Sequence, residues 1–296
     1  MSPNLNFPLP PGCSEPPVWT ANGFRIDGKL FPILSYDVGP IAWGDELTEI
    51  HEELAGDDHY IDRASREHAA AELQRRVTAP DARIMDIGCS SGFFLRLLRE
   101  RFPGRTIIGA DCILGPLERL SRTIPDTPLL QFDLLKCPWP DGSFDGLTLL
   151  NVLEHIEDDP GAARQAYRIL KPGGVAVIEV PAGPGLYDVY DRELMHFRRY
   201  RMADLLKILR TAGFEVAGKS HLGFFLFPGF WLVKKKNQKH LNAEPEVRRK
   251  MVQQSIRSHR SSAIRHAVMR LESKLRRFIY FPFGIRCLVT CRKPLI

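Results

Sequence analysis

The strongest restriction on the fold comes from one stretch of the chain, RIMDIGCSSGFFLRLL. Its first part, with the apolar residues Ile84, Met85 and Ile87, indicates a buried parallel strand at 83–86. Its second part, residues 93–98, has apolar residues at helical spacing, and Gly88 and Gly92 lie in the turn between the two parts. A strand, a glycine-bearing turn and a helix N-terminus together make a nucleotide-type pocket at the carboxyl end of a sheet.

An acid ends the predicted strand of this stretch. Asp86 does not suit a pyrophosphate, and it favours a ligand with a positively charged end. The stretch resembles the first motif of the class I S-adenosylmethionine-dependent methyltransferases, Asp/Glu-x-Gly-x-Gly-x-Gly, with Ser90 in place of the middle glycine. The resemblance implies that Gly88 faces the methionine part of S-adenosylmethionine and that Asp86 helps to bind its ammonium group. On this stretch alone, the alternative is a strand–helix corner of a dinucleotide-binding protein.

Two further acids follow at the ends of predicted strands. Asp111 ends the strand at 106–111, near the separation of about 20 residues from the first glycine at which an acid meets ribose hydroxyls. Asp133 ends the strand at 128–133 and precedes Leu134. In the family, the first carboxylate accepts hydrogen bonds from the ribose, and the second binds the adenine amine beside an apolar residue that covers the ring. A helix cap is the alternative role for Asp111.

The remaining family motifs occur in the expected order as far as residue 180. A strand at 146–151 leads into the sequence NVLEH, and LKPGG precedes a strand at 175–180. The Asp/Asn-Pro-Pro-Tyr/Phe sequence with which nucleic-acid amino-methyltransferases hold a flipped base is absent here, which argues against a nucleic-acid acceptor. The resemblance implies cofactor contacts by Asp86, Gly88, Ser90, Gly92, Asp111, Cys112, Asp133, Leu134, Asn151, Val152 and His155.

The segment after the fifth predicted strand, residues 181–200, is rich in glycine, proline, aromatic and charged residues. It lies on the carboxyl side of the sheet, where a substrate is expected. Related bacterial methyltransferases of small molecules and cell-envelope glycans have a similar His-x-Arg-Arg-Tyr sequence, whose histidine either acts chemically or fastens the loop. By residue type, the candidates for a catalytic base are His196, Asp191 and His155, and those for substrate contact are Tyr36, Tyr60, Tyr187, Tyr190, Arg199 and Tyr200.

The N-terminal part of the chain predicts an arm followed by a lid. Six prolines in residues 1–19 predict a loose arm, and an Asp-Gly pair within residues 24–31 predicts a small hairpin. A short helix is expected at 45–54. A longer helix, capped by Asp57 or Asp58, is expected to run to about Val77 with Ile61, Ala64, His68 and Ala71 on one face. Methyltransferases of this class often carry such helices as a lid over the cofactor.

The positive charge of the chain is concentrated near its C-terminal end. The whole chain has a net charge of +6, but residues 234–277 hold 14 Lys or Arg and 3 acidic residues, net +11, against −5 elsewhere. An aromatic segment at 222–233 precedes this region, and an apolar stripe recurs at helical spacing over residues 264–278. Such a region packs on its own domain or a second subunit, contacts an anionic membrane surface or a lipid acceptor, or, as the least favoured alternative, contacts nucleic acid.

Cysteine usage and hydropathy indicate the compartment. The six cysteines are scattered without zinc-type pairing, which predicts reduced thiols in a cytoplasmic protein, peripheral to the inner membrane face if the basic segment binds lipid. The sequence shows no signal-peptide pattern, and no apolar run reaches the about 18 residues of a spanning helix. No carboxylate cluster stands out beyond the cofactor acids, so no metal site is expected.

Together, these features predict an α/β fold with a Rossmann-like seven-stranded methyltransferase sheet flanked by helices. The expected parts are an N-terminal arm and lid (1–80), a cofactor-binding core (81–220), a basic and aromatic helical insertion (221–283) and the last core strand (284–296). The expected function is S-adenosylmethionine-dependent methyl transfer to an oxygen or nitrogen of a small-molecule, glycan or lipid-linked acceptor. The alternatives are a non-catalytic cofactor-binding scaffold and an NAD(P)-dependent oxidoreductase, the latter disfavoured by Asp86.

Overall fold

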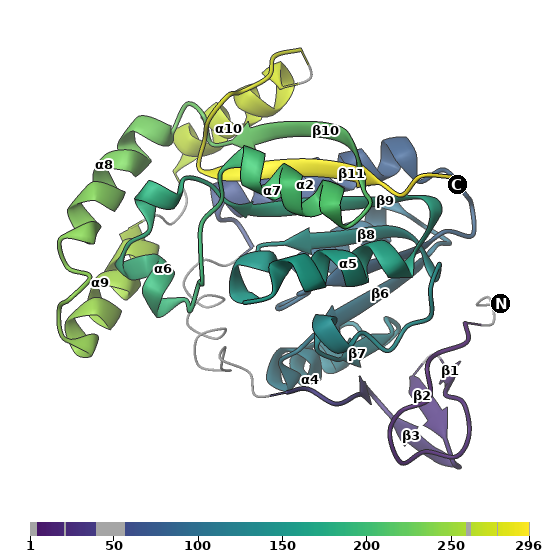
Figure 1. Ribbon diagram of the computed structural model, residues 1–296. Helices are drawn as coiled ribbons and strands as arrows, with labels where there is room; N and C mark the ends of the chain where they lie inside the picture. Colours follow the sequence, from purple (N-terminus) through teal and green to yellow (C-terminus); the bar gives the residue numbers. More distant parts are fainter. Residues whose placement is uncertain (1–4, 21, 40–56, 259–261, 277, 296) are drawn as a thin grey trace.

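Eight strands form one central sheet in the order β10-β11-β9-β8-β5-β6-β7-β4 (Figure 1). The structure is a computed structural model that describes residues 5–20, 22–39, 57–258, 262–276 and 278–295. β11 runs antiparallel to both of its neighbours, and the other neighbouring strands are parallel. The strands are β4 (Leu34–Ser35), β5 (Arg83–Ile87), β6 (Thr106–Asp111), β7 (Leu129–Gln131), β8 (Phe144–Leu150), β9 (Leu170–Pro181), β10 (Glu215–Leu222) and β11 (Arg286–Arg292).

The predicted seven-stranded Rossmann-like core is confirmed, and β4 adds an eighth strand at its edge. Leu34 of β4 pairs with Leu130 of β7, and the Tyr36 N–H donates to the Gln131 carbonyl oxygen at 2.9 Å. β4 is two residues long, which is too short for a periodic sequence signal.

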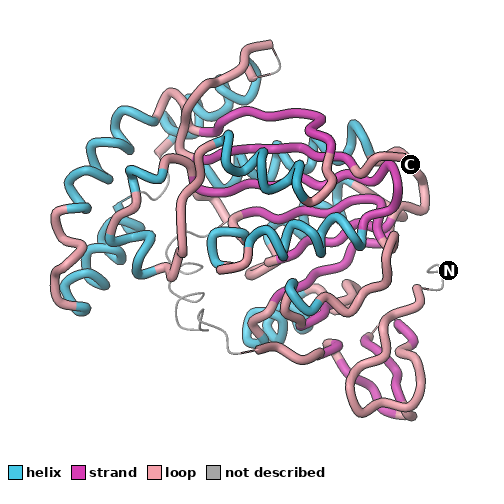
Figure 2. The backbone as a smooth tube through the Cα atoms, in the orientation of Figure 1, coloured by secondary structure: helices cyan, strands magenta, loops and turns pink. Residues whose placement is uncertain are grey.

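Helices cover both faces of this sheet and enclose two apolar cores (Figure 2). Successive side chains of a strand point to opposite faces, so Met85 belongs to one core and its neighbour Ile84 to the other. The first core is closed by α5 (Asp159–Ile169) and α7 (Met202–Thr211), and the second by α2 (Tyr60–Arg76), α3 (Phe93–Arg101) and α4 (Leu114–Thr123).

The described part of the N-terminal arm packs against the core, so the prediction of a loose arm is wrong there. Phe7 is 4% exposed and makes an edge contact with Phe24 at a ring-centroid distance of 4.9 Å. The Tyr36 hydroxyl donates to the Pro8 carbonyl oxygen at 2.6 Å. Proline content therefore did not exclude packing here, because aromatic residues between the prolines supply buried area.

A second, three-stranded sheet follows the arm, made of β1 (Val18–Thr20), β2 (Gly23–Ile26) and β3 (Lys29–Phe31). The predicted Asp-Gly hairpin connects β2 to β3 and is confirmed. Asp27 and Gly28 both have positive φ, at 47° and 75°, as a two-residue hairpin turn requires.

Helix α2 differs from its prediction in its cap and in its buried face. Its N-cap is His59, whereas Asp57 and Asp58 bond to arginines of the helix. Ile61 and Ala64 are buried as predicted, but Ala71 is exposed. The helix predicted at 45–54 lies outside the described residues.

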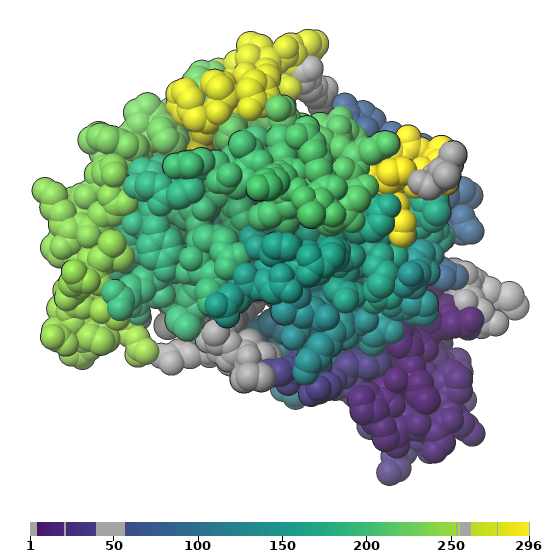
Figure 3. Space-filling model, in the orientation of Figure 1, coloured from purple at the N-terminus to yellow at the C-terminus, as the bar shows by residue number. Residues whose placement is uncertain are grey.

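The insertion between β10 and β11 consists of α8 (Phe227–Gln238), α9 (Pro245–Ser258) and α10 (Ala263–Leu275). α8 and α9 form one flank of the molecule, away from the small N-terminal sheet (Figure 3). The stripe predicted over residues 264–278 is largely exposed, since Ile264 is 76% and Phe278 88% accessible. The stripe members Val268 and Leu275 are half-buried, and α10 buries Met269 and Glu272, so packing on the chain's own domain and contact with a membrane both stay predictions.

Candidate active site

A cavity of about 630 Å³ opens at the carboxyl ends of β5, β6 and β8. Its other walls come from α2, from the segment that follows β9, and from α8 of the insertion. The volume lies in the range of sites for small molecules and cofactors. These walls meet at the carboxyl ends of the parallel strands, where sheets of this kind bind their ligands.

Asp86 lines this cavity and is the penultimate residue of β5. It is 3% exposed, and the Thr148 hydroxyl of β8 donates to its Oδ1 at 2.6 Å. Burial raises the pKa of Asp86 to about 7, with a further rise from the charge of Asp111 and an opposing effect of the Thr148 hydrogen bond. A buried carboxylate of this kind gains most from a cationic partner, so it fits the ammonium group of S-adenosylmethionine.

The turn after β5 depends on its first glycine. Gly88 has a φ of +76°, and a Cβ at this position would lie 2.6 Å from Val152 Cγ2. A side chain is therefore excluded both by the backbone conformation and by the opposite wall of the cavity. Gly92 has a different role, because it begins α3 and a Cβ there would lie 2.4 Å from Leu120 of α4.

Backbone donors hold the two remaining acids at the cavity edge. The N–H groups of Ser90 and Ile113 donate to the two carboxylate oxygens of Asp111, at 2.9 and 3.0 Å. Asp133 accepts from the Leu135 N–H at 2.9 Å. Each carboxylate oxygen has more than one lone pair, so these acids can also accept from ribose hydroxyls and from an adenine amine.

Most of the predicted cofactor residues lie around this one cavity. Among the described residues, Gly92 is the member of the predicted set that does not line it. The lining members are Asp86, Gly88, Ser90, Asp111, Cys112, Asp133, Leu134, Asn151, Val152 and His155.

A buried ion network lies in the wall built by α6 (Val189–Glu193) and α8. Asp191 is fully buried, and its Oδ1 lies 3.0 Å from His196 Nδ1 and 2.7 Å from Arg199 Nη1. Lys234 of α8 donates from Nζ to Asp191 Oδ2 at 2.9 Å and to Asp188 Oδ1 at 2.7 Å. The insertion thus supplies a charge to the interior of the site.

This network fixes the protonation of its members. Burial by itself raises the pKa of Asp191, but the His196 hydrogen bond and the charges of Lys234 and Arg199 together hold it well below its usual range. Burial lowers the pKa of His196 despite the opposing effect of Asp191. A neutral His196 that donates from Nδ1 to Asp191 carries its lone pair on Nε2.

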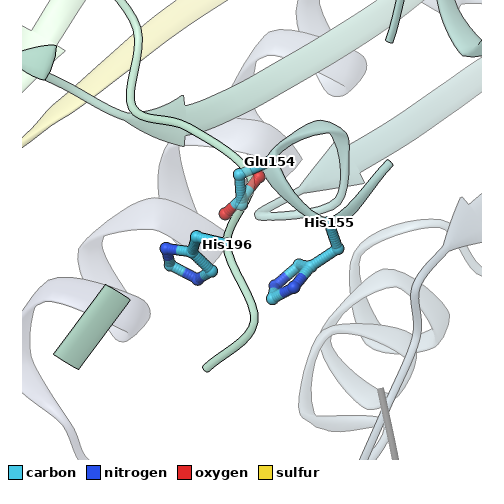
Figure 4. A group of neighbouring side chains, drawn as sticks. All are labelled: Glu154, His155 and His196. Atoms are coloured by element: carbon cyan, nitrogen blue, oxygen red, sulfur yellow. The ribbon is translucent and has the colours of Figure 1, made fainter. Parts of the chain in front are cut away.

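The structure also gathers a group that the sequence did not predict. Glu154, His155 and His196 each bring one ligand-type atom within 4.8 Å of the others, and the three side chains converge (Figure 4). Glu154 is fully buried, and among the described residues neither of its carboxylate oxygens has a hydrogen-bond partner. Burial raises the pKa of Glu154 to about 8. The expectation of no metal-type cluster overlooked this arrangement, because Glu154 and His196 lie 42 positions apart in the sequence.

The predicted substrate and catalytic residues divide into two groups. The three catalytic candidates, His196, Asp191 and His155, all line the cavity, as do Tyr60, Tyr190 and Arg199. Three other tyrosines are not among the described lining residues, and their hydroxyls bond elsewhere. These hydroxyls donate from Tyr36 to Pro8, from Tyr187 to the His196 carbonyl, and from Tyr200 to Asp159.

Sequence reasoning missed three charged residues of this site. No role was predicted for Asp188 or Glu154, and Lys234 was predicted only as one of the charges of the basic segment at 234–277. Asp188 had a local signal, because it forms a capping box with Asp191 at the start of α6. Lys234 had no local signal in the sequence. It is the first of three consecutive lysines, and the other two, Lys235 and Lys236, are exposed.

Comparison with known proteins identifies the family. A family model described as a methyltransferase domain matches residues 59–218, which is more than half of the chain. The chain belongs to the class I S-adenosylmethionine-dependent methyltransferases. This methyltransferase is 33% identical over 126 residues to a demethylmenaquinone methyltransferase of Thermus thermophilus, covering 39% of this chain and 57% of the relative. The chain therefore spans about half the length of such curated relatives.

Solved structures show the same fold at low sequence identity. The cyclase SpnF superposes with a TM-score of 0.55 at 19% identity, covering 87% of this methyltransferase and 98% of that chain. A phosphoethanolamine N-methyltransferase 2 of Haemonchus contortus, solved with phosphomonomethylethanolamine and S-adenosylhomocysteine, superposes with a TM-score of 0.53 at 17% identity, covering 83% and 57%. These likenesses concern the fold, which also supports other chemistry.

Proposed function

We propose that this protein transfers a methyl group from S-adenosylmethionine to a small-molecule acceptor. The observation that carries the proposal is the meeting of Asp86, Asp111 and Asp133 at the ends of adjacent strands around one cavity. When bound, S-adenosylmethionine supplies a methyl group on a positively charged sulfur, so its leaving group is already in place. The protein's part is to align the acceptor with this group and to exclude water.

The three acids bind different parts of the cofactor in this proposal. Asp86 binds the ammonium group, because among the described residues its buried carboxylate has no cationic partner in the cavity. Asp111 accepts from the ribose hydroxyls with lone pairs that Ser90 and Ile113 do not use. Asp133 accepts from the adenine amine, and the neighbouring apolar Leu134 covers the ring.

The acceptor lies on the side of the cavity lined by Tyr60, Tyr190 and His196. Its oxygen or nitrogen forms a bond to the methyl carbon while the carbon–sulfur bond breaks, and that electron pair stays on sulfur. The proton of an oxygen acceptor passes to Nε2 of His196, whose Nδ1–H is held by Asp191 at 3.0 Å. His155, 4.6 Å from His196 between ring centroids, restricts how the imidazole turns.

The proposal also includes the chemical class of the acceptor. The relatives' names specify acceptors as different as demethylmenaquinone and phosphoethanolamine, so a small molecule is their shared element. The half-apolar lining contributed by Tyr60, Tyr190 and Phe230 suits an acceptor with a ring or a lipid part. We propose a glycan or lipid-linked acceptor with transfer to oxygen.

Calorimetric titration with S-adenosylhomocysteine and with NADH tests the cofactor assignment. We expect binding of the first and not of the second. Asp111→Ala should weaken binding of S-adenosylhomocysteine by about 1–3 kcal/mol, because the ribose hydroxyls lose their acceptor. Asp81→Ala, at an exposed acid outside the cavity, is the matched control. NADH binding would support the oxidoreductase, and cofactor binding without methyl transfer to any acceptor would support the scaffold.

We also propose that the insertion contacts an anionic lipid surface. Trp231 and Leu232 of α8 are 43% and 62% exposed, and Lys235 and Lys236 follow them on the same helix. The exposed Phe283 extends this surface, because its ring packs against Phe227 at 5.1 Å. Each Lys near an anionic bilayer contributes about 1 kcal/mol. Among the described residues, no helix has the length and apolar character to cross a bilayer.

Co-sedimentation with vesicles tests this contact. We expect binding to vesicles that contain phosphatidylglycerol at low salt, weaker binding at high salt, and little binding to phosphatidylcholine alone. A Lys235→Glu/Lys236→Glu double variant should lose most of this binding. Protein that stays in the supernatant under every condition would contradict the membrane proposal and would leave the cofactor assignment intact.

A further inference from the structure

In the part of the chain that the structure describes, the cavity wall contains a buried carboxyl group, Glu154, without a hydrogen-bond partner. Glu154 is 0% exposed and, in the described part of the chain, neither Oε atom has a hydrogen-bond partner. A carboxylate taken out of water normally has several such partners, and leaving it without them costs free energy. A positively charged or hydrogen-bonding ligand would therefore stabilise the Glu154 side chain.

Two imidazoles face this carboxylate. Glu154 and His155 lie in the 3-10 turn Leu153–His155 after β8, and His196 comes from the segment after α6. Their ligand-type atoms lie within 4.8 Å of one another (Figure 4). Three ligands at about 2.1 Å from one ion are at most about 4.2 Å apart, so movements of less than about 1 Å would bring them together.

The surroundings of His196 match those of a metal-bound histidine. Its Nδ1 lies 3.0 Å from Asp191 Oδ1, which directs the Nε2 lone pair to the other side of the ring. Metal-ligating histidines commonly donate their second N–H to a carboxylate in this way. Arg199 and Lys234 fix Asp191 in turn, so the imidazole is oriented before any ion arrives.

We propose that Glu154, His155 and His196 bind a divalent first-row transition-metal ion of the zinc type. Two imidazoles and one carboxylate are the donor set of several catalytic zinc sites, in which three protein ligands leave a position open for water or substrate. The open position here faces the cavity, so the site suits catalysis rather than structural support. Metal binding itself does not depend on the proposed methyl transfer.

The metal site also implies a class of acceptor, and this second step rests on the proposed methyl transfer. An ion at this site uses the Nε2 lone pair of His196, so activation of the acceptor passes from the imidazole to the ion. A hydroxyl at the open position releases its proton to water more readily, as zinc-bound water does. The preferred acceptor is then an oxygen beside a second oxygen, such as a vicinal diol or a hydroxy acid, because two neighbouring oxygens can bind one ion.

Cobalt binding to the full chain tests the site. The protein is stripped with a chelator and titrated with Co²⁺, which reports its ligands through visible absorption, and then with competing Zn²⁺. We expect one ion per chain, and a change in the cobalt spectrum when acetohydroxamate is added as a bidentate oxygen probe. Glu154→Gln should lower the affinity at least about ten-fold, the smallest loss typical even for residues that only support a ligand.

A matched control and a second variant keep the result interpretable. Glu157→Gln changes an exposed carboxylate three positions along the chain and should leave Co²⁺ affinity unchanged. His155→Gln removes a partly exposed ligand and serves if Glu154→Gln does not fold. Melting temperatures equal to that of the wild type show that the fold is intact in all three variants, and equal S-adenosylhomocysteine affinity in Glu154→Gln and Glu157→Gln shows that the cofactor site is intact.

Three results would overturn the metal site. They are the absence of stoichiometric Co²⁺ binding, an affinity that Glu154→Gln and His155→Gln do not change, and a thiolate charge-transfer band that places the ion on a cysteine. If S-adenosylhomocysteine binds in the same preparation, the metal site alone has failed. If neither ligand binds, the proposed methyl transfer has failed as well.

Discussion

Substitution of Lys234 by methionine removes the ammonium group that the insertion supplies to the interior of the active site. Lys234 is 4% exposed and faces two fully buried carboxylates, Asp188 and Asp191, at 2.7 and 2.9 Å. Methionine keeps most of the length of the side chain but loses the ammonium group, including its cation–π contact at 5.4 Å from the Phe230 ring centroid, so the loss is mainly one of charge. Asp191 retains Arg199, whereas Asp188 is left with backbone donors.

Loss of one partner from a buried pair costs about 3–5 kcal/mol, because the remaining charge stays out of water. The entropy of unfolding of a chain of this length is about 0.6 kcal/mol/K, so Lys234→Met should lower Tm by about 5–8 °C. Lys235→Met, next to it on the exposed side of α8, should change the free energy of unfolding by less than about 0.5 kcal/mol.

Differential scanning calorimetry of both variants provides the assay. Calorimetric titration with S-adenosylhomocysteine should give equal affinities, because Lys234 lies in the acceptor wall and contacts none of the three cofactor acids. If Lys234→Met melts within about 2 °C of Lys235→Met, the ion network does not stabilise the fold, and the reasoning fails.

Three more predictions concern the cofactor side, the acceptor side and the packing of the sheet. Affinity for S-adenosylhomocysteine should fall about ten-fold from pH 8 to pH 6, since the pKa of Asp86 is about 7 beside Asp111 and only the ionised form attracts ammonium. Asp86→Asn should abolish this dependence in calorimetry. His196→Asn should lower kcat by about 10²–10⁴ with little change in Tm, and a parallel loss of Tm and cofactor affinity would favour a fastening role. Gly109→Ala places a Cβ 2.7 Å from Leu95 and should destabilise by about 1–3 kcal/mol in urea unfolding, whereas Gly185→Ala meets nothing within 4 Å.

Features that depend on neighbouring residues were predictable from the sequence. The hairpin at Asp27 and Gly28 follows from the turn chemistry of two adjacent residues, and the positions of Asp86 and Asp111 follow from strands that end at the same edge of a sheet. Each of these relations has a fixed geometry within one strand–helix unit. Sequence spacing therefore translated directly into spatial position.

Features that depend on contacts between distant segments were not predictable. Lys234 and Asp188 lie 46 positions apart, and no spacing rule relates α8 to α6. The apolar stripe at 264–278 predicts a helix, and α10 occupies Ala263–Leu275, but the stripe does not specify what covers it. Ile264 is consequently exposed, while Glu272, a charged residue, is buried where it accepts from the Gly223 and Phe225 N–H groups.

The position of β11 in the sheet has a consequence for synthesis of the chain. β11 leaves the ribosome after the seven other strands of this sheet, yet it lies between β9 and β10. Roughly 60 residues of insertion separate β10 from β11, and at about 5–20 residues per second their translation takes about 3–12 s. Throughout this interval the hydrogen-bonding edge of β9 is open and β10 has no partner, which invites pairing with other nascent chains. Slow or interrupted translation beyond residue 222 should therefore lower the yield of native protein more than interruption at an earlier loop.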